Sequence, residues 1–182
     1  MATTSGEPAE PPWLSAEERL AWLALLSVVR RLDGALDAQL RRDAGISHFE
    51  YVVLAVLSQS PEHTKRMSDL AAMADGSLSR LSMVVSRLER KGWVRRTPDS
   101  GDGRYTLAIL TDDGLDQVIA AAPGHVRQVR RLVFDPLTAA QVRQLTSIGQ
   151  RITHAIEAEN GCRADSPGHE PTRGASEAPP LT

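Results

Sequence analysis

Arginine and small hydroxyl residues form the parts of this sequence whose chemistry best suits binding to another molecule. Serines and arginines alternate with apolar residues between positions 79 and 87, and Asp102-Gly103-Arg104 follows within a run of turn-forming residues. A guanidinium group is a planar, weakly hydrated cation that donates several hydrogen bonds, so it binds anions well. A serine hydroxyl donates a hydrogen bond and takes little space. Both segments therefore predict contact with an anionic partner.

The residue patterns that catalysis or metal binding needs are missing from the sequence. It has no glycine-flanked nucleophilic serine, phosphate-binding glycine loop or dinucleotide-binding motif. The five histidines lack the spacing of metal ligands, and the aspartates near position 102 do not fit a calcium loop. The single cysteine, Cys162, leaves no intrachain disulfide. We therefore expect no enzyme activity, no metal and no cofactor.

The charges are unevenly distributed along the chain. The formal net charge of all 182 residues is −2, but residues 65–104 contain nine Lys and Arg against five Asp and Glu. This segment thus carries +4, and the rest of the chain carries −6. A basic segment in an acidic chain favours an anionic partner for one face. Arginines on solvated helix surfaces would explain the same count without a partner.

Composition divides the chain into a body and two tails. Residues 1–13 and 161–182 are rich in Pro, Glu, Ala and Ser, so we expect them to be disordered. Residues 14–160 have the length of one domain. No uncharged apolar run approaches the roughly 18–20 residues of a membrane span, and no signal peptide is evident. These features predict a cytoplasmic protein without a membrane contact.

Helix-capping patterns and apolar spacing predict the elements of the body. Capping boxes that start helices are predicted at Ser15 with Glu18, Ser47 with Glu50, and Thr138 with Gln141. We expect Ser68 to cap a short helix, Gly92 to end a helix over residues 78–91, and Pro123 with Gly124 to kink or break a helix over residues 112–134. Residues 93–97 and 104–110 alternate like strands around the turn sequence PDSGDG.

The predicted order is four helices, a β-hairpin and two more helices. A short helix, a tight turn, a second helix with a polar face and a hairpin form a winged helix-turn-helix. A helix is narrow enough to enter the major groove of DNA. A cation at the hairpin tip suits a narrow, electronegative minor groove.

The same region resembles a known family. Its recurring pattern is found here as Arg87-Leu88, Gly92-Trp93-Val94, Arg96, Asp102-Gly103-Arg104 and Leu110-Thr111-Asp112-Asp113-Gly114. These residues resemble the multiple-antibiotic-resistance-regulator (MarR) family of winged helix-turn-helix transcription factors. The resemblance implies a mainly α fold with a β-hairpin wing, plus a homodimer formed through the first helix and the last two. It also implies a transcriptional regulator, expected to be a repressor, on a pseudo-palindromic site in double-stranded DNA. A monomer in which these helices only cover the core is the alternative.

The candidate DNA contacts lie on the predicted helix over residues 78–91 and on the predicted hairpin, the wing: Ser79, Arg80, Ser82, Met83, Arg87, Arg96, Asp102 and Arg104. Arg104 is the expected wing-tip contact, and Asp102 is expected to orient it by a charge-assisted hydrogen bond. A surface ion pair of little energetic value is the alternative for these two residues. Arg87 could contact a phosphate or pair with an acidic neighbour in its own helix turn. Of Arg95 and Arg96, only one is expected to face DNA.

The resemblance also implies a small anionic or phenolic effector bound between the dimerising helices and the winged part. The candidate residues are Trp22, Arg30, His48 and Tyr51, and a helix-packing role stays open for each. Some relatives sense peroxides with a cysteine near the first helix, but Cys162 lies in the predicted tail, which disfavours a redox role. A winged-helix protein–protein interaction module without DNA binding is the alternative function. The net charge favours that alternative, whereas the hydroxyl-bearing helix and the Asp-x-Arg wing oppose it.

Overall fold

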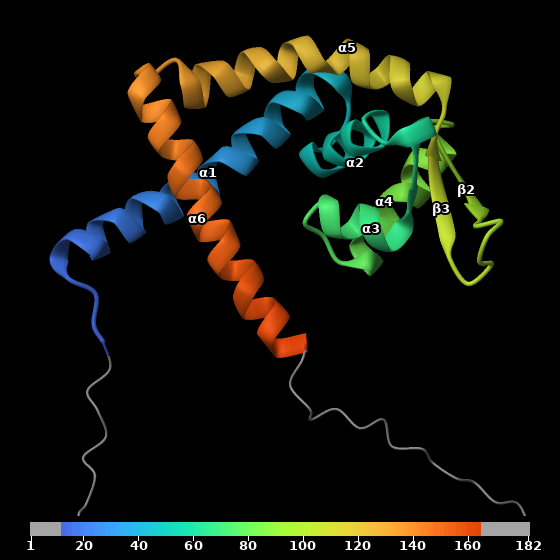
Figure 1. Cartoon of the computed structure of the whole chain (residues 1–182). Coiled ribbons are helices and arrows are strands. Elements are labelled where there is room, and N and C mark those ends of the chain that lie inside the picture. The colour runs from blue at the N-terminus through green and yellow to red at the C-terminus, as the bar shows by residue number, and fades with distance from the viewer. Residues whose placement is uncertain (1–11, 165–182) are drawn as a thin grey trace, which may run out of the picture. The chain divides into compact units, whose positions relative to one another are not determined.

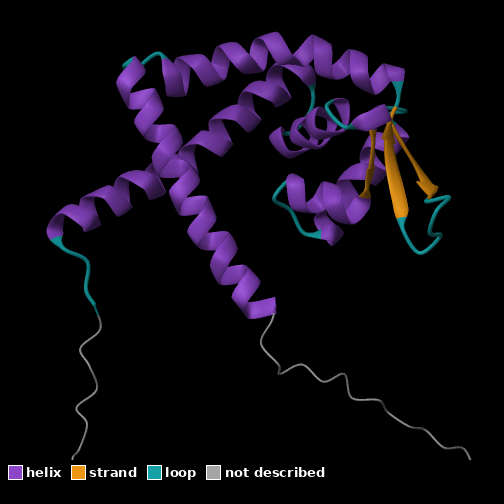
Figure 2. Cartoon of the chain, viewed as in Figure 1, coloured by secondary structure: helices purple, strands orange, loops and turns teal. Residues whose placement is uncertain are grey.

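The computed structural model describes residues 12–164, which form six α-helices and one three-stranded antiparallel sheet (Figures 1 and 2). The helices are α1 (Ala16–Ala44), α2 (His48–Ser58), α3 (Met67–Met73), α4 (Leu78–Arg90), α5 (Asp112–Val129) and α6 (Ala139–Ala164). The strands are β1 (Thr64–Arg66), β2 (Val94–Pro98) and β3 (Thr106–Leu110). A 3-10 turn, η1 (Pro61–His63), precedes β1, and a π-helical turn, η2 (Arg130–Phe134), follows α5.

The described chain divides into two compact units, one that ends at Asp135 and one that begins at Pro136 and contains α6. The predicted mainly α fold with a hairpin wing is confirmed. The first four residues of the predicted C-terminal disordered tail, 161–164, belong instead to α6, so this part of the prediction is wrong. Residues 1–11 and 165–182 lie outside the described residues, and the predicted domain limits of 14 and 160 otherwise remain predictions.

Three capping boxes start helices where the sequence predicts them. The Ser15 and Ser47 hydroxyls accept hydrogen bonds from the backbone N–H groups three residues later, and the glutamates at those positions accept from the cap backbones. Thr138 and Gln141 make the equivalent pair of bonds ahead of α6. Each box satisfies backbone groups that the first turn of a helix would otherwise leave unpaired.

Two expectations about helix ends are wrong. Ser68 lies inside α3, whose N-cap is Arg66, because the buried Met67 already belongs to the helix and the Ser68 hydroxyl bonds the Asp69 carboxylate. A break at Pro123, one of the two predicted alternatives, is also wrong, because α5 continues to Val129. The other alternative, a kink there, stays a prediction. The proline removes one backbone hydrogen bond, but α5 packs along both α1 and α2, and this packing outweighs the loss.

The sheet has one strand more than the predicted hairpin. β2 and β3 pair antiparallel with Val94 opposite Leu110 and Pro98 opposite Thr106. β1 adds to the free side of β3, giving the order β1-β3-β2. Three residues are too few for a strand to show an alternating pattern in the sequence.

A single apolar core joins the helix-turn-helix to the sheet. Leu54 and Leu57 of α2, Leu81 and Leu88 of α4, and Ala108 of β3 are fully buried in it. A smaller cluster links the second half of α1 to α2 and α5, and Trp93 contacts both clusters. The winged part and the second half of α1 are therefore held together by continuous packing, which gives the hairpin a fixed base.

Gly114 lies where α5 passes the base of the wing. A Cβ atom at this position would come within 2.2 Å of the Trp93 carbonyl oxygen and 2.7 Å of Leu110 Cδ1. The Trp93 carbonyl also accepts the backbone hydrogen bond of Thr111, the cap of α5. Only glycine permits this close approach of two backbones.

We predict that Gly114→Ala lowers the free energy of unfolding by about 1–3 kcal/mol, because the methyl group must displace backbone. Chemical denaturation followed by circular dichroism measures the loss. Gly34→Ala is the matched control, since its Cβ has no neighbour within 4 Å in the same chain. That variant should be neutral or stabilised by up to about 1 kcal/mol. Equal stability of the two variants would contradict the close contact at Gly114.

Candidate functional site

The turn between α3 and α4 sets the direction of α4. Asp75 has a left-handed backbone (φ 50°), and the Gly76 N–H bonds back to the Ala71 carbonyl at 2.9 Å. Ser77 then caps α4 by accepting the Arg80 N–H at 3.2 Å. The first turn of α4 contains no acidic residue, unlike the first turns of α1, α2 and α5. Its positive end is thus open to an external anion.

The outward face of α4 carries most of the predicted helix contacts. Ser79, Arg80, Met83 and Arg87 are exposed and Ser82 is half-buried, whereas the opposite face of α4 lies in the core. The Ser79 hydroxyl lies 3.1 Å from the Ser77 hydroxyl. The Arg80 guanidinium stacks 4.1 Å from the centre of the Phe49 ring. This stacking limits the rotamers of Arg80 and leaves its N–H groups free to donate outward.

Arg87 pairs with Glu50 of α2, and its partner is not an acidic residue of its own helix turn. Its Nε lies 3.2 Å from Glu50 Oε1, and the Glu50 side chain is only 9% exposed. The other carboxylate oxygen accepts the Ser47 N–H at 2.8 Å. Burial alone would raise the pKa of Glu50, but hydrogen bonds from Ser47 and Arg87 bring that pKa below its ordinary value. Arg87 is therefore held against α2 while about half of its side chain stays exposed.

Arg96 ties the wing to α4. Its backbone N–H and its Nε donate to the two carboxylate oxygens of Glu89 at 2.9 and 2.8 Å, and a terminal nitrogen donates to the Ser86 hydroxyl at 3.1 Å. The Arg96 hydrogen bond lowers the pKa of Glu89 despite some burial. Because Ser86 and Glu89 belong to α4, this contact fixes the hairpin relative to that helix.

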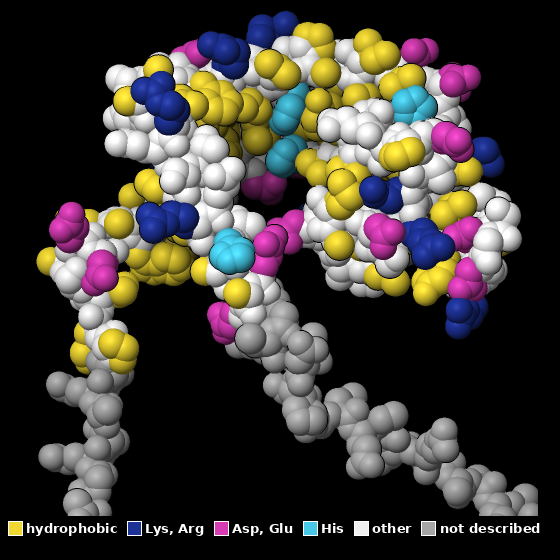
Figure 3. All heavy atoms as spheres, viewed as in Figure 1, with side chains coloured by type: hydrophobic (Ala, Val, Ile, Leu, Met, Phe, Trp, Pro, Cys, Tyr) yellow, Lys and Arg dark blue, Asp and Glu magenta, His cyan; other side chains and the backbone are white. Residues whose placement is uncertain are grey.

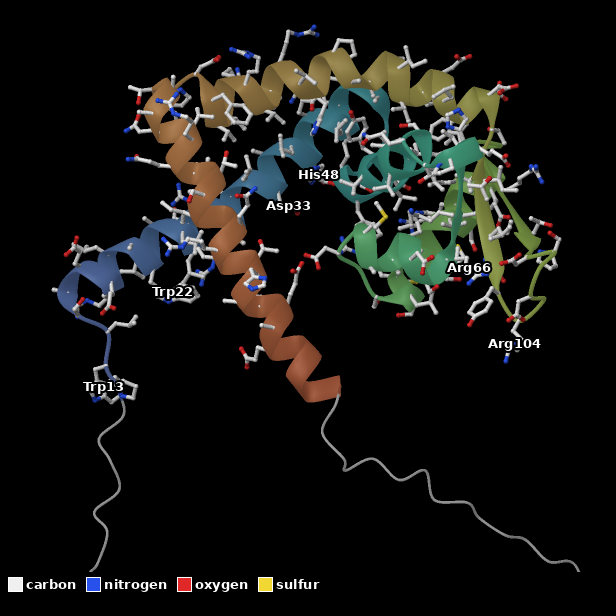
Figure 4. All side chains as sticks on the ribbon, viewed as in Figure 1. Trp13, Trp22, Asp33, His48, Arg66 and Arg104 are labelled. Carbon is white, nitrogen blue, oxygen red and sulfur yellow. The ribbon has the colours of Figure 1, made fainter. Side chains whose placement is uncertain are left out.

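Arg104 projects from the tip of the wing (Figure 4). Its side chain is 84% exposed, and it forms a forked ion pair with Asp102 whose shortest distance is 2.7 Å. The Arg104 hydrogen bond holds the pKa of Asp102 below its ordinary value. The predicted orienting pair is thus present. A surface ion pair contributes little to stability, so its main effect is to set the direction of Arg104.

The four candidate effector residues do not meet in one chain. His48 Nδ1 lies 2.7 Å from Asp33 Oδ1, and Tyr51 packs on His125 with ring centres 4.5 Å apart. Burial, and then the neighbouring His48, lowers the pKa of His125. Trp22 lies eleven residues before Asp33 on α1, about 16 Å along the helix, and Figure 4 shows this separation. Arg30 is exposed on α1.

A surface hollow lies between α1, α2 and α4, and its lining includes Asp33, Asp37, His48, Phe49, Arg80 and Arg87. It borders the outward face of α4 on one side and the His48–Asp33 contact on the other. No three metal-binding side chains cluster within the part of the chain that the structure describes. Nor does any helix of that part have the length and apolar character to cross a membrane.

Four residues of this site are not apparent from the sequence. Phe49 and Glu50 position Arg80 and Arg87, Arg66 contacts the wing, and His125 completes the aromatic cluster. Glu50 is recognisable only as a helix cap, and nothing in the local pattern connects Arg66 with a residue 33 positions later. These contacts depend on tertiary packing.

Comparison with known proteins agrees with this geometry. The MarR family pattern matches residues 46–106, from just before α2 to the first residue of β3. The chain is also similar to Sco3205, a MarR family transcriptional regulator from Streptomyces coelicolor whose crystal structure is a complex with DNA. The two are 44% identical with a TM-score of 0.77, and the match covers 81% of this chain and 92% of Sco3205. The chain belongs to the MarR family.

Two further relatives extend the comparison. AbsC, a MarR family transcriptional regulator from Streptomyces coelicolor, is 35% identical with a TM-score of 0.76, and the match covers 81% of this chain and 99% of AbsC. The transcriptional repressor IacR of Pseudomonas putida is 30% identical over 105 residues. That match covers 58% of this chain and 61% of IacR. The MarR resemblance predicted from residues 87–114 is thus confirmed over a much longer part of the chain.

Replacing the Glu50 carboxylate tests how much it supports the MarR helix-turn-helix. Glu50→Gln keeps the size and one acceptor oxygen but leaves Arg87 without a counter-charge. We expect a loss of about 1–3 kcal/mol in the free energy of unfolding, measured by urea denaturation. Glu18→Gln is the matched control, because Glu18 forms the same capping box on an exposed helix without an arginine partner. A loss no larger than that of Glu18→Gln would show that the Arg87 pair adds nothing.

Proposed function

We propose that this chain is a DNA-binding transcriptional repressor that acts as a homodimer, with α4 in the major groove and Arg104 in the adjacent minor groove. One observation carries the proposal. The wing that bears the highly exposed Arg104 is tied to α4 by Arg96, so the two DNA-facing surfaces form one rigid unit. A rigid helix and hairpin can contact neighbouring grooves without an ordering cost at the moment of binding.

The groups on α4 suit a phosphate-lined groove. Ser77 and Ser79 lie at a helix start that is free of acidic residues, which favours a DNA phosphate there. Arg80 and Ser82 come next on the same face, in position for base edges or further phosphates. Met83 is 62% exposed and offers an apolar contact, as a thymine methyl group would need.

The first half of α1 supports the homodimer. Its apolar side chains from Leu20 to Val29 lie almost entirely at the surface of the single chain, and Figure 3 shows apolar side chains along this half of the helix. Trp22, Leu23 and Val28 are 49%, 55% and 56% exposed. In α6, Leu145, Ile148, Ile152 and Ile156 form a second exposed apolar stripe with helical spacing. Contiguous exposed apolar side chains along a helix mark an interface, and a second copy of the chain can cover them.

The hollow beside α4 supports release of the repressor by a small effector. An anionic or phenolic molecule there would meet the Arg80 and Arg87 guanidiniums and the His48 ring, with the Asp33 and Asp37 carboxylates on the same lining. The same two arginines belong to the DNA-facing side of α4. Such a molecule would therefore hold these two arginines in positions that differ from those that DNA binding needs. An effector that binds the DNA-free state more tightly in this way shifts the protein toward that state.

Removal of the Arg104 guanidinium tests the wing contact. We predict that Arg104→Ala weakens binding to a duplex, selected by the wild-type protein from a random pool, by about 1–3 kcal/mol, on the order of 5- to 150-fold. Fluorescence anisotropy across a salt series measures the effect, and wild-type affinity should fall steeply as salt rises.

Arg131→Ala is the matched control because it removes the same charge from an exposed position in η2. Its affinity should stay within about 2-fold of wild type. An equal loss of affinity in the two variants would show that Arg104 contributes only through its general positive charge. Failure of the wild-type protein to bind any duplex would refute the proposed function itself.

A further inference from the structure

Arg66 connects β1 to the loop of the wing. Its Nε donates to Asp99 Oδ2 at 3.0 Å, and a terminal nitrogen lies 2.8 Å from the same oxygen. The guanidinium carbon lies 4.4 Å from the centre of the Tyr105 ring. Asp99 and Tyr105 stand at the two ends of the loop that carries Arg104. In Figure 4, Arg66 lies beside the wing and Arg104 at its tip.

The loop itself is organised around Asp99. The second carboxylate oxygen accepts the Gly101 N–H at 2.9 Å. The Asp99 N–H donates to the Tyr105 carbonyl at 2.9 Å, and the Tyr105 N–H donates to the Asp102 carbonyl at 3.0 Å. The hydrogen bond from Gly101, and then the one from Arg66, keep the pKa of Asp99 below its ordinary value. The Asp99 side chain is 13% exposed, so this ion pair is more shielded from water than the one at the tip.

We propose that Arg66 is a positioning residue for Arg104: by holding Asp99 and the Tyr105 ring, it fixes the wing loop in the shape that presents Arg104 to DNA. This inference rests on the proposed function, because it concerns the same DNA contact. A free loop would have to become ordered on binding, which costs conformational entropy and lowers affinity. The Arg66 contacts reduce that cost in advance.

Direct contact with DNA is a poorer role for Arg66. Its guanidinium already has a carboxylate on one side and an aromatic face beside it. An arginine engaged in this way would have to give up both partners to reach a phosphate. The two roles differ in one measurable respect. A positioning residue acts only while Arg104 is present, whereas a second phosphate contact acts independently of it.

The first test is a double-mutant cycle on the selected duplex described above. We expect Arg66→Ala to weaken binding by on the order of 5- to 50-fold, and to cost less than about 2-fold further when Arg104 is already alanine. Asp99→Ala separates positioning from charge. It removes an anion close to the DNA, so electrostatics alone predicts tighter binding, whereas the loss of loop order predicts weaker binding.

The second test needs no DNA. Hydrogen–deuterium exchange of a peptide spanning residues 97–105 should speed up in Arg66→Ala, while a peptide from the buried part of α2 exchanges as in the wild-type protein. This pattern separates a loosened wing from general unfolding.

Tighter binding by Asp99→Ala would overturn the inference, and so would any of three other results. One is that Arg66→Ala binds DNA within about 2-fold of the wild-type affinity while Arg104→Ala binds more weakly. That result would leave the proposed function intact. Another is additivity of the two alanine changes, which would make Arg66 a DNA contact in its own right. The third is unchanged exchange in residues 97–105. Absence of any duplex binding by the wild-type protein would instead defeat the proposed function and this inference together.

Discussion

The Glu50 carboxylate connects three features on which the position of α4 depends. It completes the capping box of α2, it lies at the edge of the core, and it pairs with Arg87 of α4. A buried carboxylate without partners would be strongly unfavourable, so α2 and α4 must keep the arrangement that supplies those partners. The direction of α4 is thus set by electrostatics as well as by the apolar residues beneath it.

The wing is held by a comparable set of contacts. Arg96 links β2 to α4, Arg66 links β1 to the loop, and Asp102 directs Arg104. Each of these arginines pairs with a carboxylate, so the local cations are partly neutralised within the chain. The wing tip nevertheless presents one guanidinium, that of Arg104, whose side chain is 84% exposed. The position of a few exposed guanidiniums matters more here than the total charge.

The sequence predicts the helices and the hairpin well because their signals are local. Capping boxes at Ser15, Ser47 and Thr138 depend on residues three positions apart, and the Asp102–Arg104 pair on residues two apart. The failures have physical reasons. Packing against α1 and α2 stabilises α5 as a helix on both sides of Pro123. Strand β1 is too short to show an alternating pattern of apolar residues.

The site was harder to predict than the fold. Contacts such as Arg66 with Asp99 and Glu50 with Arg87 join residues more than thirty positions apart, and no spacing rule reports them. The candidate effector residues show the same limit. His48 lies beside Asp33 and close to His125, whereas Trp22 lies several turns away on the exposed half of α1. Polar or aromatic character alone does not show which positions lie together in the fold.

The central claim is that two copies of this chain bind DNA through α4 and Arg104. Affinity cleavage of DNA from the wing tip tests this claim most directly. An iron chelate would be attached to Ser100→Cys in a Cys162→Ser background and bound to the selected duplex. We predict two clusters of cleavage in the minor groove, placed symmetrically on either side of the centre of the site. The two α4 helices should bind between these clusters, in major grooves about one helical turn apart. A single cluster, or cleavage without symmetry, would contradict the account.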